Sequence, residues 1–362
     1  MTFVGRGVIR CRLSLCTAVP IPDSGIFAHL NSGNMRRKIS LLILLFGVFT
    51  LFVRKDAFLP GSASPTESIP PSTSSDTRKD SVPELLFFLV PENISVRSYF
   101  KFLQKVVADY QPRVPYPLSE HLLVRANPWM IDTLQQTDYY RRKALGDTVW
   151  VQTDECILHR GDTLFFPDSM AAVALQDRID HTSIDVNIPE FRLRILEYGK
   201  VVYVFPVRVG QNRVRFLAEA GHSVDLRTRT GNGSVIRINR YPVFVNPVDG
   251  KKFTHTRRDD GVVTLMPQIP WTEVELDGMR YGQMIHPTTN PNTLEKAYSN
   301  GCIGLGEADA WRFYYSAPLG TQVTFRYDLQ VVNDAGDTIT LPDIYKRGKK
   351  KQAVRAVIGV FP

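Results

Sequence analysis

The amino-acid sequence predicts a mainly β domain over residues 183–328, with one helix near its end, and a smaller α+β region over residues 83–180. The first observation is a change of apolar period at residue 183, from helical spacing to alternation with polar residues. The second is a Gly-containing turn at 197–200 between two alternating runs, which is typical of a β-hairpin. A chain of 362 residues is long enough for two such domains.

The start of the chain lacks the pattern of a folded domain. Residues 1–34 show no periodicity and are interpreted as a non-native or disordered extension. A basic triplet at 36–38 precedes a 15-residue apolar run at 39–53, so residues 35–55 match a signal anchor or a signal peptide. No convincing cleavage site follows, which favours the anchor. Residues 56–82 are rich in Ser and Pro and predict a flexible linker.

The α+β region contains one clearly amphipathic helix. Within residues 96–110, Phe100 and Leu103 belong to a set of apolar residues at helical spacing. A second helix is expected over residues 127–143, because Pro128 suits the first turn of a helix.

Short strands are expected in the rest of this region, at 147–151 and 156–158. Residues 160–168, RGDTLFFPD, weakly resemble the ending of small glycan-binding modules. The simpler interpretation, a turn and an edge strand that packs on the following domain, is preferred.

The β domain is predicted from its alternating runs. Residues 184–188 and 191–195 alternate between apolar and polar side chains, and residues 201–209 continue the alternation after the turn. The other expected elements are strands at 235–238 and 262–265, a loop-rich candidate flap at 242–270, a helix from residue 306 and a basic tail at 329–362.

One cysteine and one histidine carry the candidate chemistry. Cys302 ends a small-residue turn, Ser-Asn-Gly-Cys, and lies 16 positions after His286. A thiol is a nucleophile as thiolate, and a neighbouring imidazole is the usual group that takes its proton. Cys302 is flanked by small or polar residues, which is typical of a presented side chain. The helix expected from residue 306 would add its N-terminal dipole, although acidic residues in its first turn oppose that gain.

These residues resemble the active-site signature of the L,D-transpeptidases, the YkuD-type cysteine enzymes of bacterial cell-wall metabolism. The resemblance covers residues 183–328 and implies a β-sandwich-like catalytic domain with a helix after the catalytic cysteine. Further segments that resemble the family follow in order at 207–210, 230–233, 309–311 and 320–323.

The resemblance also implies roles for the site residues. Cys302 is the expected nucleophile and His286 the expected base. The remaining candidates are Ser299, Asn300 and Gly301, as oxyanion-forming or site-orienting residues, and Thr288, Tyr298 and Gly304, as substrate-binding residues.

Three positions depart from the family pattern. Asn300 stands where the family often has His, and Pro287 follows the motif histidine where Gly or Ser is usual. Gly304 stands where the family usually has Arg or Asn, so a side chain that would hold a substrate carboxylate or order the site is missing. The nucleophile and base are retained, so the departures bear on the substrate rather than on the reaction class.

The function that the resemblance implies is peptidoglycan L,D-transpeptidation. The thiolate attacks the third-residue carbonyl of a tetrapeptide stem and releases D-Ala, and an acceptor amine then resolves the thioacyl-enzyme into a 3→3 crosslink. Two alternatives are an L,D-carboxypeptidase or endopeptidase with water as acceptor, and a non-catalytic wall-binding protein. Peptidoglycan stem peptides are the expected partners. The expected location is the periplasm or wall side of the cell envelope, with an anchor in the cytoplasmic membrane.

Composition argues against other classes. The net charge of +8 comes from basic clusters near both ends of the chain, and no basic stripe is interleaved with aromatic residues, so nucleic acid is not an expected partner. Seven histidines show no metal-ligand spacing, and neither a metal nor a cofactor is expected. The absence of Gly-x-Ser-x-Gly argues against a serine hydrolase. Cys156 is expected to be a small buried residue, and Cys302 a free thiol.

Overall fold

The protein is described here from a computed structural model, which covers residues 86–147, 151–217, 221–245, 250–333 and 335–348. The predicted extension, anchor segment and linker (1–82) lie outside the described residues, as do 148–150 of one predicted strand and the end of the basic tail. Within the described ranges, no helix is both long enough and apolar enough to span a bilayer.

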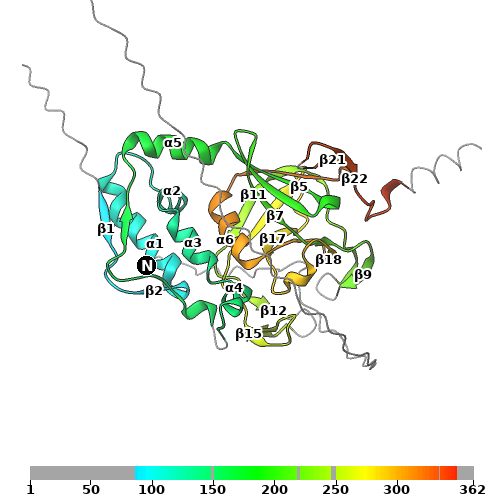
Figure 1. The fold of residues 1–362 in the computed structure, drawn as a ribbon, viewed down its shortest axis with the longest axis horizontal. Helices are drawn as coiled ribbons and strands as arrows, with labels where there is room; N and C mark the ends of the chain where they lie inside the picture. The colour runs from blue at the N-terminus through cyan, green and yellow to red at the C-terminus, as the bar shows by residue number, and fades with distance from the viewer. Residues whose placement is uncertain (1–85, 148–150, 218–220, 246–249, 334, 349–362) are drawn as a thin grey trace, which may run out of the picture. The chain divides into compact units, whose positions relative to one another are not determined.

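A mixed eight-stranded sheet forms the centre of the β domain (Figure 1). Its strands, in spatial order, are β19 (Ile303–Leu305), β17 (Met284–Pro287), β16 (Trp271–Leu276), β11 (Gly231–Asn239), β20 (Gln322–Arg326), β5 (Thr182–Asn187), β6 (Arg192–Glu197) and β7 (Lys200–Pro206). The pairs β17–β19 and β20–β5 are parallel and the others are antiparallel. The predicted mainly β class and the hairpin of β6 and β7 are confirmed.

Seven further strand pairs surround the sheet. They are β1 (Phe87–Leu89) with β4 (Thr163–Phe165), β2 (Ile94–Ser95) with β3 (Cys156–Leu158), β8 (Val209–Gly210) with β18 (Ala297–Ser299), β9 (Val214–Leu217) with β10 (His222–Asp225), β12 (Phe244–Val245) with β13 (Lys252–Phe253), β14 (His255–Arg257) with β15 (Val263–Leu265), and β21 (Gln330–Val332) with β22 (Thr338–Thr340).

Six α-helices and four short 3₁₀ helices complete the described residues. The α-helices are α1 (Val96–Tyr110), α2 (Glu120–Ala126), α3 (Trp129–Gln135), α4 (Tyr139–Ala144), α5 (Ser169–Asp180) and α6 (Glu307–Ser316). The 3₁₀ helices are η1 (Gln111–Arg113), η2 (Gln152–Asp154), η3 (Ile188–Glu190) and η4 (Pro291–Thr293).

The N-terminal region is more helical than the sequence predicts. Helix α1 has the predicted bounds, because its apolar stripe is buried. The helix expected over residues 127–143 is divided into α3 and α4, because the Asp138 carboxylate accepts the N–H groups of Tyr140 and Arg141 and so caps a new helix. Helices α2 and α5 were not expected.

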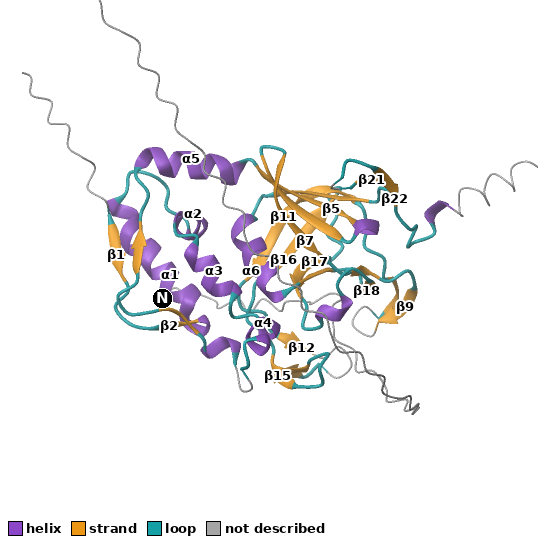
Figure 2. Ribbon diagram, in the orientation of Figure 1, coloured by secondary structure: helices purple, strands orange, loops and turns teal. Residues whose placement is uncertain are grey.

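Helix α6 joins the N-terminal region to the sheet, and Figure 2 shows it between the helices and the strands. Trp311 of this helix is fully buried. The Glu120 carboxylate, from α2, accepts hydrogen bonds from the hydroxyls of Tyr314 at 2.9 Å and Tyr315 at 3.1 Å. Because these groups are buried and satisfy one another, the two regions share one core.

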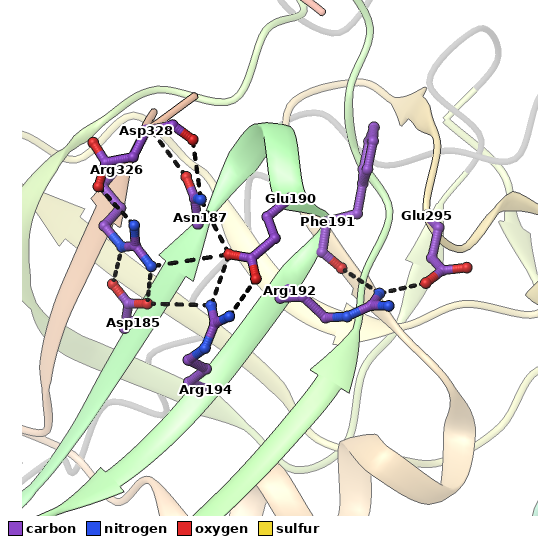
Figure 3. A network of polar contacts seen from close by, with 9 residues as sticks. All are labelled: Asp185, Asn187, Glu190, Phe191, Arg192, Arg194, Glu295, Arg326 and Asp328. Atoms are coloured by element: carbon purple, nitrogen blue, oxygen red, sulfur yellow. Dashed lines mark hydrogen bonds and ion pairs between the residues drawn. The ribbon is translucent and has the colours of Figure 1, made fainter. Parts of the chain in front are cut away.

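An ionic network fastens one end of the sheet, as Figure 3 shows. Arg326 of β20 forms a two-pronged contact with Asp185 of β5, with distances of 2.7 and 3.0 Å. Arg194 of β6 binds Glu190 and lies 3.6 Å from the same Asp185 carboxylate. Two cations and two carboxylates therefore hold three neighbouring strands in register.

The start of the segment expected to be a basic tail belongs to the fold. The strands β21 and β22 form a hairpin there. Tyr345, which follows the hairpin, is 2% exposed. Its hydroxyl accepts the Thr228 N–H at 3.0 Å and donates to the Gly210 carbonyl at 2.8 Å. This part of the chain thereby supports the loop on which the candidate site rests.

Candidate active site

His286 lies on β17 and is 3% exposed. Its Nδ1 is 2.8 Å from the Pro287 carbonyl oxygen, which accepts a hydrogen bond, so Nδ1 carries the proton in the neutral ring. Nε2 therefore presents a lone pair, and it is buried without a hydrogen-bond partner among the described residues. Burial and the nearby Arg208 cation lower the pKa of His286 to about 3. The imidazole is thus a neutral base at physiological pH.

Cys302 is placed beside His286 by the parallel pairing of β17 and β19. His286 is in register with Gly304, and Cys302 immediately precedes β19. Side chains two residues apart on an extended segment point to the same face, so Cys302 lies on the face that carries the imidazole. The cysteine is fully buried in an apolar cluster with Phe244, Trp271 and Met284.

The sulfur of Cys302 is engaged in a disulfide bond in this structure, contrary to the expected free thiol. Cys156 is not its partner, because Cys156 is a free cysteine. Cys156 is also only half-buried rather than buried as expected, because it lies at the end of the short pair β2–β3. Any nucleophilic chemistry at Cys302 therefore belongs to the reduced protein.

Ser299 closes the turn that leads to the cysteine. Its hydroxyl donates to the Cys302 carbonyl at 2.6 Å and accepts the Gly301 N–H at 3.2 Å. Gly301 has φ +116°, a conformation that side-chain-bearing residues rarely adopt, so glycine is required there. The Gly301 N–H is used by Ser299, so it does not serve as an oxyanion donor in this arrangement.

Further hydrogen bonds, which the sequence did not indicate, connect this turn to residues of other segments. The Thr228 hydroxyl donates to the Gly301 carbonyl at 3.0 Å and accepts the Gly210 N–H at 2.8 Å. Tyr345 bridges Thr228 and Gly210, as described above. These residues come from three distant segments, and only the similarity of residues 207–210 to a family segment pointed to one of them.

Arg208 occupies the space above Gly304. The two residues exchange backbone hydrogen bonds of 2.9 and 3.0 Å. A Cβ atom on Gly304 would lie 2.5 Å from Arg208 Nε and 2.6 Å from its Cγ, so no side chain fits there while Arg208 keeps its place. The side chain missing at position 304 is thus replaced in space by Arg208.

The remaining predicted residues lie around this centre with different surroundings. Tyr298 is 49% exposed. It lies close enough to Arg208 to raise the pKa of the guanidinium, against the larger lowering effect of burial. Asn300 is half-buried in the turn. The Thr288 hydroxyl is used within its own loop, where it accepts the Asn290 N–H at 3.1 Å.

The N-terminus of α6 does not serve the cysteine, contrary to expectation. The three residues of β19 intervene, which places the helix about 10 Å along the chain, beyond the first-turn range of a helix dipole. One N–H group of its first turn, that of Ala308, is bonded instead to the N-terminal region. Asp138 accepts the Ala308 N–H at 3.0 Å, and Glu307 in return accepts the Tyr139 N–H at 3.2 Å.

The predicted flap contains the hairpin of β14 and β15 and is anchored by a buried ion pair. Arg258 and Glu307 are in contact and are 1% and 2% exposed in their side chains. Arg258 also lies over the Tyr139 ring, 4.4 Å from its centroid. Burial raises the pKa of Glu307, against the lowering effect of Arg258. The hairpin is therefore fixed to both α6 and the N-terminal region.

A cavity of about 330 Å³ adjoins the apolar cluster around Cys302. Phe244 belongs to both the cavity wall and the cluster, and Phe253 and Met266 extend the wall. Arg97, Arg240 and Lys252 also line it. An apolar wall with a few cationic groups is typical of a pocket for an organic anion.

The segment that contains this site matches a known protein family. Residues 181–325 match the family model of the L,D-transpeptidase catalytic domain (YkuD). The match identifies residues 181–325 as a domain of the L,D-transpeptidase type. No curated protein matches the sequence.

Solved structures of L,D-transpeptidases are similar to part of the chain. An L,D-transpeptidase from Mycobacterium smegmatis is 13% identical, with a TM-score of 0.28, over 40% of this chain and 58% of that protein. L,D-transpeptidase 1 of Mycobacterium tuberculosis is 15% identical, with a TM-score of 0.26, over 40% and 61%. An L,D-transpeptidase from Xylanimonas cellulosilytica is 14% identical, with a TM-score of 0.30, over 66% and 98%. This chain thus spans less than two thirds of the length of the two mycobacterial enzymes. The likeness to the family is carried by residues 181–325.

Proposed function

We propose that this protein is a peptidoglycan L,D-transpeptidase that uses Cys302 as nucleophile and His286 as base. The observation that carries the proposal is the tautomer of His286. Its Nδ1–H is held by the Pro287 carbonyl, so the lone pair of the buried Nε2 is available on the face that carries Cys302. A base oriented through its other nitrogen is the recurrent arrangement of nucleophilic catalysis.

The first half-reaction transfers an acyl group to sulfur. Nε2 of His286 takes the proton of the reduced Cys302 thiol, and the thiolate attacks the third-residue carbonyl of a tetrapeptide stem. A carbon–sulfur bond forms and the amide carbon–nitrogen bond breaks. The imidazolium returns its proton to the leaving amine, and D-Ala departs.

The second half-reaction resolves the thioester. The amine of a neighbouring stem attacks the acyl carbon and loses a proton to His286. The carbon–sulfur bond breaks, an amide forms, and the proton returns to the Cys302 thiolate. The product is a 3→3 crosslink between two stems, and no cofactor or metal takes part.

The tetrahedral intermediates require hydrogen-bond donors beside the sulfur. We assign this role to the backbone N–H groups of Asn300 and Cys302, and a turn-orienting role to Ser299 and Gly301. Thr288 and Tyr298 remain proposed substrate contacts, and Tyr298 is the more accessible of the two.

Water as acceptor would make the same site a carboxypeptidase or an endopeptidase. The apolar surroundings of Cys302, formed by Phe244, Trp271 and Met284, favour transfer to an amine, because they limit the access of water to the thioester. Members of this family act at the cell envelope, and we propose that this chain acts on peptidoglycan on the wall side, held by the apolar segment at 39–53.

The test uses the full chain, reduced, with a disaccharide-tetrapeptide and with Cys302→Ala as control. Mass spectrometry is expected to show loss of D-Ala, a thioester on Cys302 and a crosslinked dimer. Loss of D-Ala without dimer would establish the hydrolase instead. If the reduced protein neither turns over the peptide nor reacts with an alkylating reagent at Cys302, the wall-binding alternative replaces both.

A further inference from the structure

Arg208 is a half-buried cation without a carboxylate partner among the described residues. Its Nε is buried and has no hydrogen-bond partner among the described residues, and a terminal N–H of the guanidinium donates a long hydrogen bond of 3.5 Å to Thr293 Oγ1. Burial lowers its pKa only to about 10, so the side chain is charged at neutral pH. Removing a charge from water without an anion is costly, which points to a ligand that completes the site.

The guanidinium lies beside the reacting groups. Its charge acts on His286, and its side chain fills the space over Gly304. Gly304 is in register with His286 and two residues after Cys302. Cys302 and Gly304 are two residues apart, and two residues of extended chain span about 6.6 Å. The Arg208 side chain, which lies over Gly304, is therefore about that far along the strand from Cys302.

We propose that Arg208 binds the terminal carboxylate of the donor peptide, one residue beyond the carbonyl that Cys302 attacks. The proposal rests on the proposed function and names the group that selects its substrate. Arg208 is then a specificity-determining residue, because a peptide that ends at the leaving residue presents a carboxylate there, whereas an extended or amidated peptide does not.

The spacing suits this group. In the leaving residue, the carboxylate carbon lies three bonds from the scissile carbonyl carbon, which is at most about 3.7 Å for standard bond lengths. A two-pronged carboxylate–guanidinium contact adds about 4 Å between the two carbon atoms. A carbonyl held at the sulfur therefore places its neighbouring carboxylate within reach of Arg208.

The glycine at position 304 follows from the same geometry. A Cβ there would collide with Nε, Cγ and Cδ of Arg208, at 2.5 to 2.9 Å. Any side chain at this position would displace the guanidinium from the face that carries Cys302 and His286. Gly304 and Arg208 thus form one unit, in which the cation comes from the neighbouring chain segment.

Binding to the full chain with Cys302→Ala tests the proposal without turnover or a disulfide at this position. The probes are the tetrapeptide stem ending in D-Ala and the same peptide with a terminal carboxamide, measured by calorimetry. The acid is expected to bind about 10- to 100-fold more tightly than the amide, as for a charged hydrogen-bonded pair.

Four further substitutions in this background test the role of the Arg208 cation. Arg208→Gln is expected to bind both peptides equally and weakly, and Arg208→Lys is expected to keep part of the preference, because it keeps the charge but loses the planar fork. Gly304→Ala is expected to weaken binding of the acid alone. Arg215→Gln, on the exposed strand β9, removes the same charge elsewhere and is expected to leave the preference intact.

Equal affinity for acid and amide before Arg208 is changed would overturn the proposal. The same holds if the preference persists in Arg208→Gln, or if neither peptide binds. The turnover assay separates this outcome from the proposed function. If both peptides are crosslinked at equal rates, Arg208 does not select the substrate but the transpeptidase proposal stands. If the acid binds selectively but the reduced protein does not turn it over, the transpeptidase proposal is wrong although Arg208 binds the carboxylate.

Discussion

The indole ring of Trp271 stacks on the imidazole of His286, with ring centroids 4.1 Å apart and planes 19° from parallel. The two residues lie on the adjacent antiparallel strands β16 and β17. Trp271 also packs in the cluster that contains Cys302. A single aromatic ring thus fixes the plane of the base and covers the nucleophile, which makes it a positioning residue.

Replacement of Trp271 by Leu is expected to lower kcat about 10- to 100-fold, because the imidazole loses its orienting surface. Trp271→Phe keeps a stacking ring and is expected to keep most of the rate. The indole N–H of Trp271 has no hydrogen-bond partner among the described residues, so the Phe variant loses no hydrogen bond. Steady-state kinetics of both variants, with Trp129→Leu on α3 as control, make the comparison. Equal rates for the Leu and Phe variants would contradict it.

Ser299→Ala removes both side-chain hydrogen bonds of the turn, to Cys302 and Gly301. The free energy of unfolding is expected to fall by about 1–3 kcal/mol and the acylation rate by at least about 10-fold. Ser316→Ala, which removes a buried helix contact at 2.8 Å, serves as control for stability without an effect on acylation. Urea unfolding and thiol acylation by a peptide thioester probe are the measurements. An unaltered acylation rate would remove the orienting role from Ser299.

Gly301→Ala and Gly320→Ala form a matched pair, since both glycines have positive φ, +116° and +86°. A Cβ on Gly301 would lie no closer than 3.5 Å to any neighbouring atom, and one on Gly320 would meet nothing within 4 Å, so neither substitution causes a collision. Both changes are expected to cost about 1–3 kcal/mol from backbone strain. Only Gly301→Ala is expected to abolish acylation, because it shifts the turn that presents Cys302. Full activity of Gly301→Ala would show that this turn tolerates rearrangement.

Arg258→Met leaves the Glu307 carboxylate buried without its cation. We expect a loss of about 3–5 kcal/mol in the free energy of unfolding, and a partial recovery in the Arg258→Met, Glu307→Gln double variant. Arg97→Met, in the exposed pair with Asp154, is expected to cost at most about 1 kcal/mol. Chemical denaturation measures all three. A cost for Arg258→Met no larger than that for Arg97→Met would mean that the hairpin is not anchored by this pair.

The pKa of His286, lowered from 6.5 to about 3 by burial and by Arg208, links stability to pH. Between these two values the unfolded chain binds a proton that the folded protein does not, so the contribution is present above pH 6.5 and is lost as the pH falls. Relative to His286→Gln, the wild type is expected to lose about 2 kcal/mol of unfolding free energy between pH 7.5 and pH 5. Unfolding curves at both pH values give the difference. Parallel pH profiles would contradict the lowered pKa.

The features that the sequence predicted depend on local patterns. The helix at 96–110 has a single apolar stripe, and the strand at 184–188 alternates cleanly, so both have the predicted type. Cys302 and His286 were identified as candidates because short motifs that resemble one family occur in order along the chain.

The features that could not be predicted depend on contacts between distant segments. The Asp138 carboxylate accepts the N–H of Tyr140, which starts a new helix, and also the N–H of Ala308, which is 170 residues away along the chain. Arg208 reaches the site through a backbone bridge to Gly304, and Tyr345 reaches it from beyond the last predicted strand. Neither has a local signature that distinguishes it from a surface residue.

The exchange of hydrogen bonds between Asp138 and Ala308, and between Glu307 and Tyr139, has a consequence for how the protein comes apart. The described residues between 86 and 348 belong to one compact unit, although the matched family domain begins at residue 181. A fragment cut there would expose the side of α6 that packs on the N-terminal region and would deprive the hydroxyls of Tyr314 and Tyr315 of the Glu120 carboxylate. Calorimetry of the intact chain should therefore show these residues melting in a single transition, and a protease that opens the helical region should release the nucleophile's support as well. The edge of the recognised domain is not an edge of independent folding.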